Sequence, residues 1–250
     1  MPDWISGVLA TPGLGWLFLT VMVGGLVRGF AGFGTALIIM PVASSVLTPA
    51  GALTVLVVVD LLGPIPNLPG AYRTCNRTDV MRLGLGTLIA LPVGLYGLSH
   101  MPEEVFGWLV SVLVLVTLMA LMIGWRYHGK LTPPLILGTG ATAGVLGGAT
   151  GLAGPPVIML YMASTLPGAV VRATLLLYLF VLDSMMILML AAFGMLDPAM
   201  VLIGLVLLLP FVAANVIGGQ MFKFGSERQF RAVAYTIIAG SAILGLPLWH

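Results

Sequence analysis

Long runs of uncharged, apolar residues recur along the whole chain, and they decide what kind of protein it can be. Two of them cover residues 105–123 and 198–222. Each is close to the ~20 residues that an α-helix needs to cross a ~30 Å hydrocarbon layer. None shows the alternation of apolar and polar residues that is typical of transmembrane β-strands. The sequence therefore predicts an all-α, polytopic membrane protein.

The composition excludes several function classes. Of the 250 residues, 60% are hydrophobic and 7% are charged, against roughly 25% charged in a typical soluble domain. The net charge of +2 is too small to indicate a nucleic-acid partner, and the single cysteine, Cys75, cannot form an internal disulfide. The apolar runs contain no metal-ligand cluster and no nucleophile–base arrangement. We expect no cofactor, no metal and no enzymatic activity.

The chain is similar to itself at offsets of 118–124 residues. Residues 29–33 align with residues 148–152 at an offset of 119, and Asp60 aligns with Asp183 at 123. Asp79 with Asp197 and Pro92 with Pro210 align at 118, and Glu103 with Glu227 at 124. Because these anchors occur in the same order, they predict two related halves, residues 1–130 and 131–250, with a polar joint at 126–130.

The basic residues indicate that the two halves are inverted. Arg73, Arg77 and Arg82 surround Asp79, whereas no Lys or Arg lies near Asp197. Conversely, the loop at Glu103 has no basic residue, and its counterpart contains Lys223, Arg228 and Arg231. Since Lys and Arg mark cytoplasmic loops, the pattern predicts an inverted-topology repeat, as in many secondary transporters. We expect a multi-pass protein of the cell (plasma or inner) membrane with cytoplasmic basic loops and both termini outside.

Each half contains three clear spans and one broken segment. The spans cover about 52–70, 81–98 and 105–125, then 172–193, 198–221 and 231–248. Segments 14–47 and 133–166 are interrupted by glycines, and at 1.5 Å per residue they are long for one crossing and short for two. We expect each to be a helical hairpin with its glycines at the tip. Inversion requires an odd number of full crossings in each half. A re-entrant hairpin adds none to the three spans and a hairpin with two thin crossings adds two, so the number stays odd in both cases.

The two glycine clusters resemble the paired signatures of one transporter family. Residues 25–34, followed by Ile38-Ile39-Met40-Pro41, are similar to the first-repeat signature of the TauE/SafE sulfite exporter family. Residues 144–156 resemble its second signature, with Ala153 where a glycine is common. The resemblance extends over essentially the whole chain. It implies export of sulfite, small organosulfonates or other sulfur-containing anions.

The hairpin tips are the candidate substrate site. Non-helical backbone at membrane depth is tolerated only where protein or a watery cavity satisfies its polar groups. The second arm of each hairpin would direct the positive end of its dipole to the midplane, and two such ends can bind an anion. Alternatively, the glycines allow close helix packing. The candidate substrate-binding residues are Arg28, Gly29, Gly32, Phe33, Gly34, Gly148, Thr150, Gly151, Gly154 and Pro155.

Three charged residues lie within apolar surroundings. Arg28 would cost at least ~2.5 kcal/mol as an isolated charge in hydrocarbon, so it binds the substrate anion, pairs with Asp60 or Asp183, or snorkels to an interface. The two carboxyl groups are candidate proton carriers, with helix capping or packing near a kink as the alternative. Asn67, Thr150, Asn215 and Gln220 are either polar lining or interhelical hydrogen-bond partners.

Together these features predict a secondary transporter that moves a small sulfur-containing anion by alternating access. Whether a proton is transported with the anion is left open. Its partners are the anion and the lipid bilayer, and a homodimer is compatible with the sequence. One alternative is an anion channel in which the same tips form the filter. Another is a transporter of a different small anion, such as a carboxylate.

Overall fold

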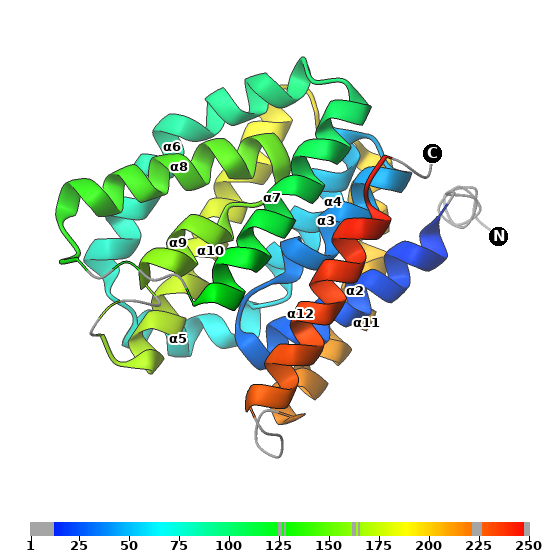
Figure 1. Cartoon of the computed structure of the whole chain (residues 1–250). Helices are drawn as coiled ribbons and strands as arrows, with labels where there is room; N and C mark the ends of the chain where they lie inside the picture. Colours follow the sequence, from blue (N-terminus) through cyan, green and yellow to red (C-terminus); the bar gives the residue numbers. More distant parts are fainter. Residues whose placement is uncertain are drawn as a thin grey trace.

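The computed structural model describes residues 13–124, 127, 129–161, 164, 166–221 and 227–247, and all regular structure within them is helical (Figure 1). The first half contains α2 (Leu14–Ala31), α3 (Thr35–Val46), α4 (Pro49–Leu62), the 3-10 turn η1 (Ile65–Asn67), α5 (Leu68–Thr74), α6 (Arg77–Ser99) and α7 (Glu103–Ile123). The second half contains α8 (Pro133–Thr150), α9 (Gly154–Tyr161), α10 (Gly168–Ala192), α11 (Pro198–Met221) and α12 (Glu227–Leu244). The all-α prediction is confirmed.

Five helical segments of the described chain are long and apolar enough to cross a membrane. They are Pro49–Thr74, Arg77–Ser99, Glu103–Ile123, Gly168–Ala192 and Pro198–Met221. The first of them combines α4, η1 and α5. The protein is therefore a multi-pass membrane protein, as predicted. The sixth predicted span, 231–248, coincides with α12, whose described apolar part, Ala234–Leu244, is shorter than a full crossing.

Both glycine-rich segments are pairs of helices that break at glycines with positive φ. The helix α2 ends at Gly32 (φ 81°), whose N–H donates to the Arg28 carbonyl, and Gly34 (φ 104°) precedes α3. In the same way α8 ends at Gly151 (φ 76°), whose N–H donates to the Gly147 carbonyl. Left-handed backbone at a helix end strongly favours glycine. These positions therefore set where each first arm stops.

Each first arm packs against a long helix of the other half. The helix α8 lies along α6, and α2 lies along α11 (Figure 1). Glycines permit this close approach, because a Cβ at each would press on the backbone of the facing helix. The contacts pair Gly144 with Thr87, Gly148 with Leu91 and Gly94 with Val145, and equally Gly25 with Phe211, Gly29 with Asn215 and Gly218 with Leu26.

These six contacts follow one numerical relation. Between the two sets, the α8 positions exceed the α2 positions by 119, and the α11 positions exceed the α6 positions by 124. In this relation Leu91 of α6, which faces Gly148, is equivalent to Asn215 of α11, which faces Gly29. The sequence comparison paired Pro92 with Pro210 at 118, which is six residues away from this packing register.

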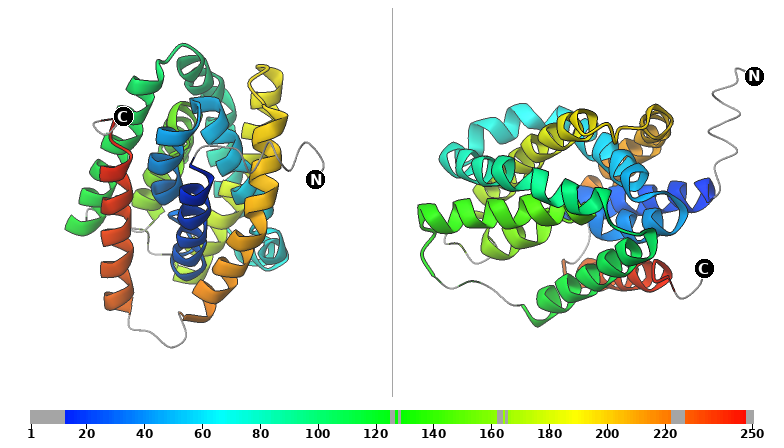
Figure 2. Two further views of the ribbon diagram at one scale, coloured as in Figure 1. Left: turned by 90° about the vertical axis from the view of Figure 1, so that its right-hand side faces the viewer. Right: turned by 90° about the horizontal axis from the view of Figure 1, so that it is seen from above.

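The helix α4, which begins the span Pro49–Thr74, lies at the centre of the molecule. Residues 51–60 of α4 are all buried, and α4 packs against α10 and α11, while α7 and α12 pack against each other and against α3 (Figure 2). The helix ends at Leu62, Pro64 follows it, and Pro66 and Pro69 lie within η1 and α5. Since proline has no N–H to continue a helical ladder, the regular α-helix is interrupted just after Asp60.

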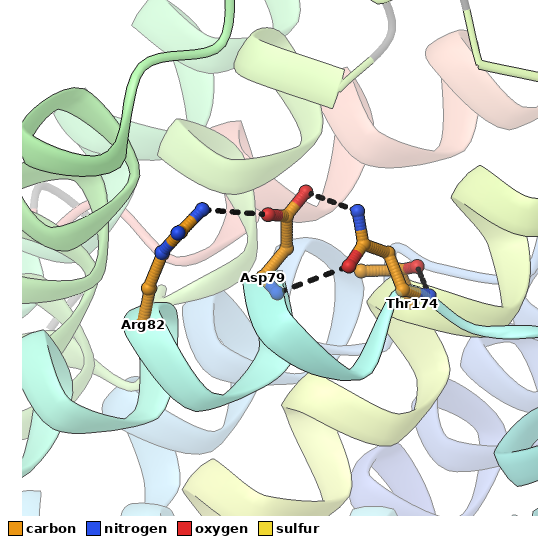
Figure 3. A network of polar contacts seen from close by, with 4 residues as sticks. Asp79, Arg82 and Thr174 are labelled. Carbon is orange, nitrogen blue, oxygen red and sulfur yellow. Dashed lines mark hydrogen bonds and ion pairs between the residues drawn. The ribbon is translucent and has the colours of Figure 1, made fainter.

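A polar network joins the start of α6 to α10 (Figure 3). The backbone N–H of Asn76 donates to Thr174 Oγ1 at 3.0 Å, and its side chain donates to Asp79 Oδ2 at 3.0 Å. The Asp79 carboxylate also pairs with Arg82 at 3.6 Å. This network fixes the N-terminal part of α10 relative to the short connection between α5 and α6.

Candidate functional site

The two hairpin tips meet at a small cavity of about 40 Å³, which we call the inner cavity. The start of α3 and the start of α9 lie on it, together with the middle of α4 and of α10. Its lining residues are Arg28, Phe33, Gly34, Thr35, Ala36, Leu37, Leu56, Asp60, Gly151, Ala153, Gly154, Pro155, Ile158, Leu179, Leu182 and Asp183. The fold thus brings residues more than 150 positions apart in the sequence to one place.

Arg28 is held in this cavity by an ion pair. Its side chain is 5% exposed, and Nη1 lies 2.7 Å from Asp60 Oδ2. The same nitrogen donates to Thr35 Oγ1 at 3.1 Å. Of the three roles considered for Arg28, the structure therefore contains the pairing with Asp60, and the burial of the side chain is incompatible with snorkelling to an interface.

Asp183 contributes a second carboxylate to the inner cavity. Asp60 and Asp183 are 8% and 6% exposed. Within the described residues, Asp60 Oδ1 and Asp183 Oδ2 are buried without a hydrogen-bond partner. With all three side chains ionised, the cavity would carry a net charge of −1. A buried charge without a partner is costly, so the two unpartnered carboxylate oxygens are the least favourably placed polar atoms of this cavity.

A larger cavity of about 520 Å³, which we call the vestibule, adjoins the inner cavity at Arg28. Residues from α2, η1, α5, α10 and α11 surround it. The lining residues are Arg28, Gly29, Gly32, Pro64, Asn67, Gly70, Ala71, Thr74, Ala169, Arg172, Ala173, Leu176, Asn215, Val216 and Gly219. Asn67, Thr74 and Arg172 are exposed, so the vestibule opens to the surface at the end of the molecule that carries Arg73.

The predicted site residues fall into three groups. The inner cavity contains Arg28, Phe33, Gly34, Gly151, Gly154 and Pro155, as well as Asp60 and Asp183. Gly29 and Gly32 line the vestibule, as do Asn67 and Asn215.

The third group, Gly148 and Thr150, lines neither cavity. Gly148 packs against Leu91 of α6. Thr150 is fully buried, and its hydroxyl donates to the Leu146 carbonyl within α8. Their roles in this structure are helix packing and a local hydrogen bond. Gln220, considered as polar lining, is exposed outside both cavities.

Two residues of the site were not among those predicted. Thr35 follows the tip glycine Gly34, and a hydroxyl at the first position of the second arm was a signal that could have identified it. Arg172 lines the vestibule, and its Nη2 donates to the Gly29 carbonyl at 3.2 Å. The sequence offered only a basic residue near a predicted span end, which is ordinary for a cytoplasmic boundary.

Comparison with known proteins gives a family match over most of the chain. Residues 17–244 match the family described as "Sulfite exporter TauE/SafE". A curated relative from Cupriavidus necator, named "Probable sulfite/organosulfonate exporter TauE", is 26% identical over 255 residues, which cover 97% of this chain and 94% of the relative. No solved structure matches the chain.

Proposed function

The chain belongs to the TauE/SafE sulfite exporter family, and from this premise we propose that it is a secondary transporter that exports sulfite or a small organosulfonate. The relative from Cupriavidus necator, whose name mentions both substrates, supports this substrate class. The observation that carries the proposal is the position of Arg28. It is the charged residue that borders both the open vestibule and the inner cavity between the hairpin tips.

The anion competes with Asp60 for Arg28. In the described state the guanidinium is paired with Asp60 Oδ2 and bonded to Thr35. A sulfite or sulfonate oxygen is an equally good acceptor for a guanidinium. Since two anions beside one guanidinium repel each other, substrate binding requires that Asp60 lose its negative charge or move away.

Protonation of the two carboxyl groups supplies the coupling. A proton taken up by Asp60 neutralises the competitor and releases Arg28 for the substrate, and Asp183 lies on the same cavity to accept a second proton. When the proton leaves, Asp60 pairs with Arg28 again and displaces the anion. Anion occupancy and proton occupancy are thereby linked at one site.

Alternating access follows from two inverted repeats that face each other across the site. The glycine contacts between α2 and α11 and between α6 and α8 support this plan, because each hairpin is docked on the opposite half in the same register. The vestibule opens beside Arg73, at the end that we place in the cytoplasm by the positive-inside rule. In this assignment the described state is open to the cytoplasm through the vestibule.

Sulfite flux in proteoliposomes tests the proposal. We expect saturable flux for the wild type, a dependence on an imposed pH gradient, and loss of flux in Arg28→Ala. Equal flux in wild type and Arg28→Ala, with both proteins folded, would remove Arg28 from the site. Flux that rises linearly with sulfite and ignores the pH gradient would favour a channel instead. Flux of a carboxylate without flux of sulfite would change the substrate class.

A further inference from the structure

A second arginine, Arg172 of α10, lies at the tip of the first hairpin. Its Nη2 donates to the Gly29 carbonyl at 3.2 Å, and its Nε lies 3.0 Å from where a Cβ on Gly32 would be. The side chain crosses from the second half of the chain to the first. The Arg172 side chain therefore lies over the last turn of α2, and the residue that it contacts there, Gly29, is the neighbour of Arg28 in the sequence.

Local structure explains why Arg172 stays there. The last carbonyls of a helix lack intrahelical donors and form the negative end of its dipole. The Gly29 carbonyl belongs to the last turn of α2, so a guanidinium is a favourable partner. The network of Asn76, Asp79 and Thr174 holds the start of α10 two residues further along (Figure 3). Arg172 is thus positioned by its own bond to Gly29 and by the attachment of α10 at Thr174.

The vestibule around Arg172 has the chemistry of an anion site. Its lining contains the guanidinium of Arg172, the guanidinium of Arg28 (whose charge is offset by Asp60), the amide side chains of Asn67 and Asn215, and the hydroxyl of Thr74. No Asp or Glu is among its described lining residues. The other walls are mostly Gly and Ala, which leave room beside the arginines. The inner cavity is the opposite case, because it contains two carboxylates and one guanidinium.

We propose that Arg172 is a second anion-binding residue, which captures the sulfur oxyanion in the vestibule before the anion reaches Arg28. This rests on the proposed transport function of the Arg28 site. Arginine binds oxyanions through paired N–H donors and keeps its charge at all physiological pH values. A cationic side chain on the wall of a cavity also raises the local anion concentration. Capture at Arg172 and competition with Asp60 at Arg28 are then two successive steps.

The test uses full-length protein reconstituted in one orientation, with sulfite supplied from the face that carries the vestibule. The variants are Arg172→Gln, Arg172→Lys and the matched control Arg73→Gln. Arg73 is an exposed arginine in the last turn of α5 that does not line the vestibule. We expect KM to rise about tenfold in Arg172→Gln, which loses a charged donor, with the maximal rate within about twofold. Arg172→Lys should recover part of the increase, and Arg73→Gln should stay close to wild type.

Several outcomes overturn the inference. An unchanged KM in folded Arg172→Gln, with a lower Tm, would mean that Arg172 only stabilises the end of α2. An equal rise of KM in Arg73→Gln would mean that general surface charge, rather than a site, attracts the anion. If the wild type shows no sulfite flux, the transport proposal fails separately. Sulfite titration into the purified protein then decides: binding lost in Arg172→Gln but kept in Arg73→Gln supports the site, and no binding to wild type rejects it.

Discussion

The two glycine-broken hairpins share their backbone design and differ in charge. Both first arms end at a glycine in the left-handed conformation, at Gly32 and Gly151, and both dock on the other half through glycines. At the offset of 119, however, the position of Arg28 is occupied by Gly147. The second tip, residues 147–155, contains no ionisable side chain. The glycine break and the glycine packing occur in both hairpins, whereas an ionisable side chain occurs at the first tip and not at the second.

This difference leads us to propose separate tasks for the two hairpins. In the proposed mechanism the first hairpin, which carries Arg28 and is contacted by Arg172, provides the positive charge for the anion. The second closes the inner cavity with backbone and small side chains, including Gly151, Gly154 and Pro155. This division predicts that, of the two hairpins, only the first contains a charge whose substitution lowers sulfite flux. Substitutions of the packing glycines should destabilise the protein equally in both hairpins.

The largest expected effect is the removal of the charge that distinguishes the first hairpin. Arg28→Gln should lower sulfite flux at least about a hundredfold, because the charged donor for the anion is lost. It should also destabilise the protein by about 3–5 kcal/mol, since Asp60 remains buried without its partner. Flux in proteoliposomes and thermal unfolding in detergent measure the two effects.

The double variant Arg28→Gln/Asp60→Asn separates transport from stability. Without the unpaired carboxylate, most of the lost stability should return, while flux stays low. If flux returns together with stability, Arg28 is a structural residue and the first hairpin has no special role in binding.

The shared packing gives the next largest effect. Gly29→Ala and Gly148→Ala should each destabilise the protein by about 2–3 kcal/mol, because the new Cβ overlaps the backbone of Asn215 or Leu91. Thermal unfolding of both variants tests this. Gly15→Ala in α2 and Gly138→Ala in α8 are matched controls with no atom within 4 Å of the added Cβ. Tolerance of one substitution and not the other would break the equivalence of the two packing interfaces.

The sequence could predict the features that depend on local rules. Glycines with positive φ and apolar runs locate the hairpin tips and the spans, and a lone charge in such a run identifies Arg28. Tertiary contacts were harder to predict: Arg172 reaches Gly29 across 143 residues, and nothing local distinguishes Asp60 from Asp183 as the partner of Arg28. The identical residues Pro92 and Pro210 suggested a register that differs from the glycine packing, because close backbone contact constrains a helix more than a shared proline does.

The two carboxylates allow a finer test of the first hairpin. Asp183→Asn keeps the Arg28–Asp60 pair, so flux should remain while its response to a pH gradient weakens, because the second of the two proposed proton sites is lost. Asp60→Asn removes the competitor of the anion, so KM should fall and the maximal rate should fall with it as release slows. Flux at fixed sulfite across a series of imposed gradients measures both. A pH response that is unchanged in both variants would exclude these carboxyl groups as the proton carriers.

The smallest expected effect compares one threonine from each hairpin. Thr35 Oγ1 accepts a hydrogen bond from Arg28, whereas the Thr150 hydroxyl donates to the Leu146 carbonyl and accepts from the Leu152 N–H, with no contact to Arg28. Thr35→Val should raise KM about fivefold, since Arg28 loses a partner that orients it. Thr150→Val should leave KM unchanged and lower Tm slightly. Concentration series of initial sulfite flux distinguish the two variants. An equal rise in KM for Thr150→Val would mean that the anion also contacts the second tip during transport, and the second hairpin would then be a binding partner rather than a neutral wall.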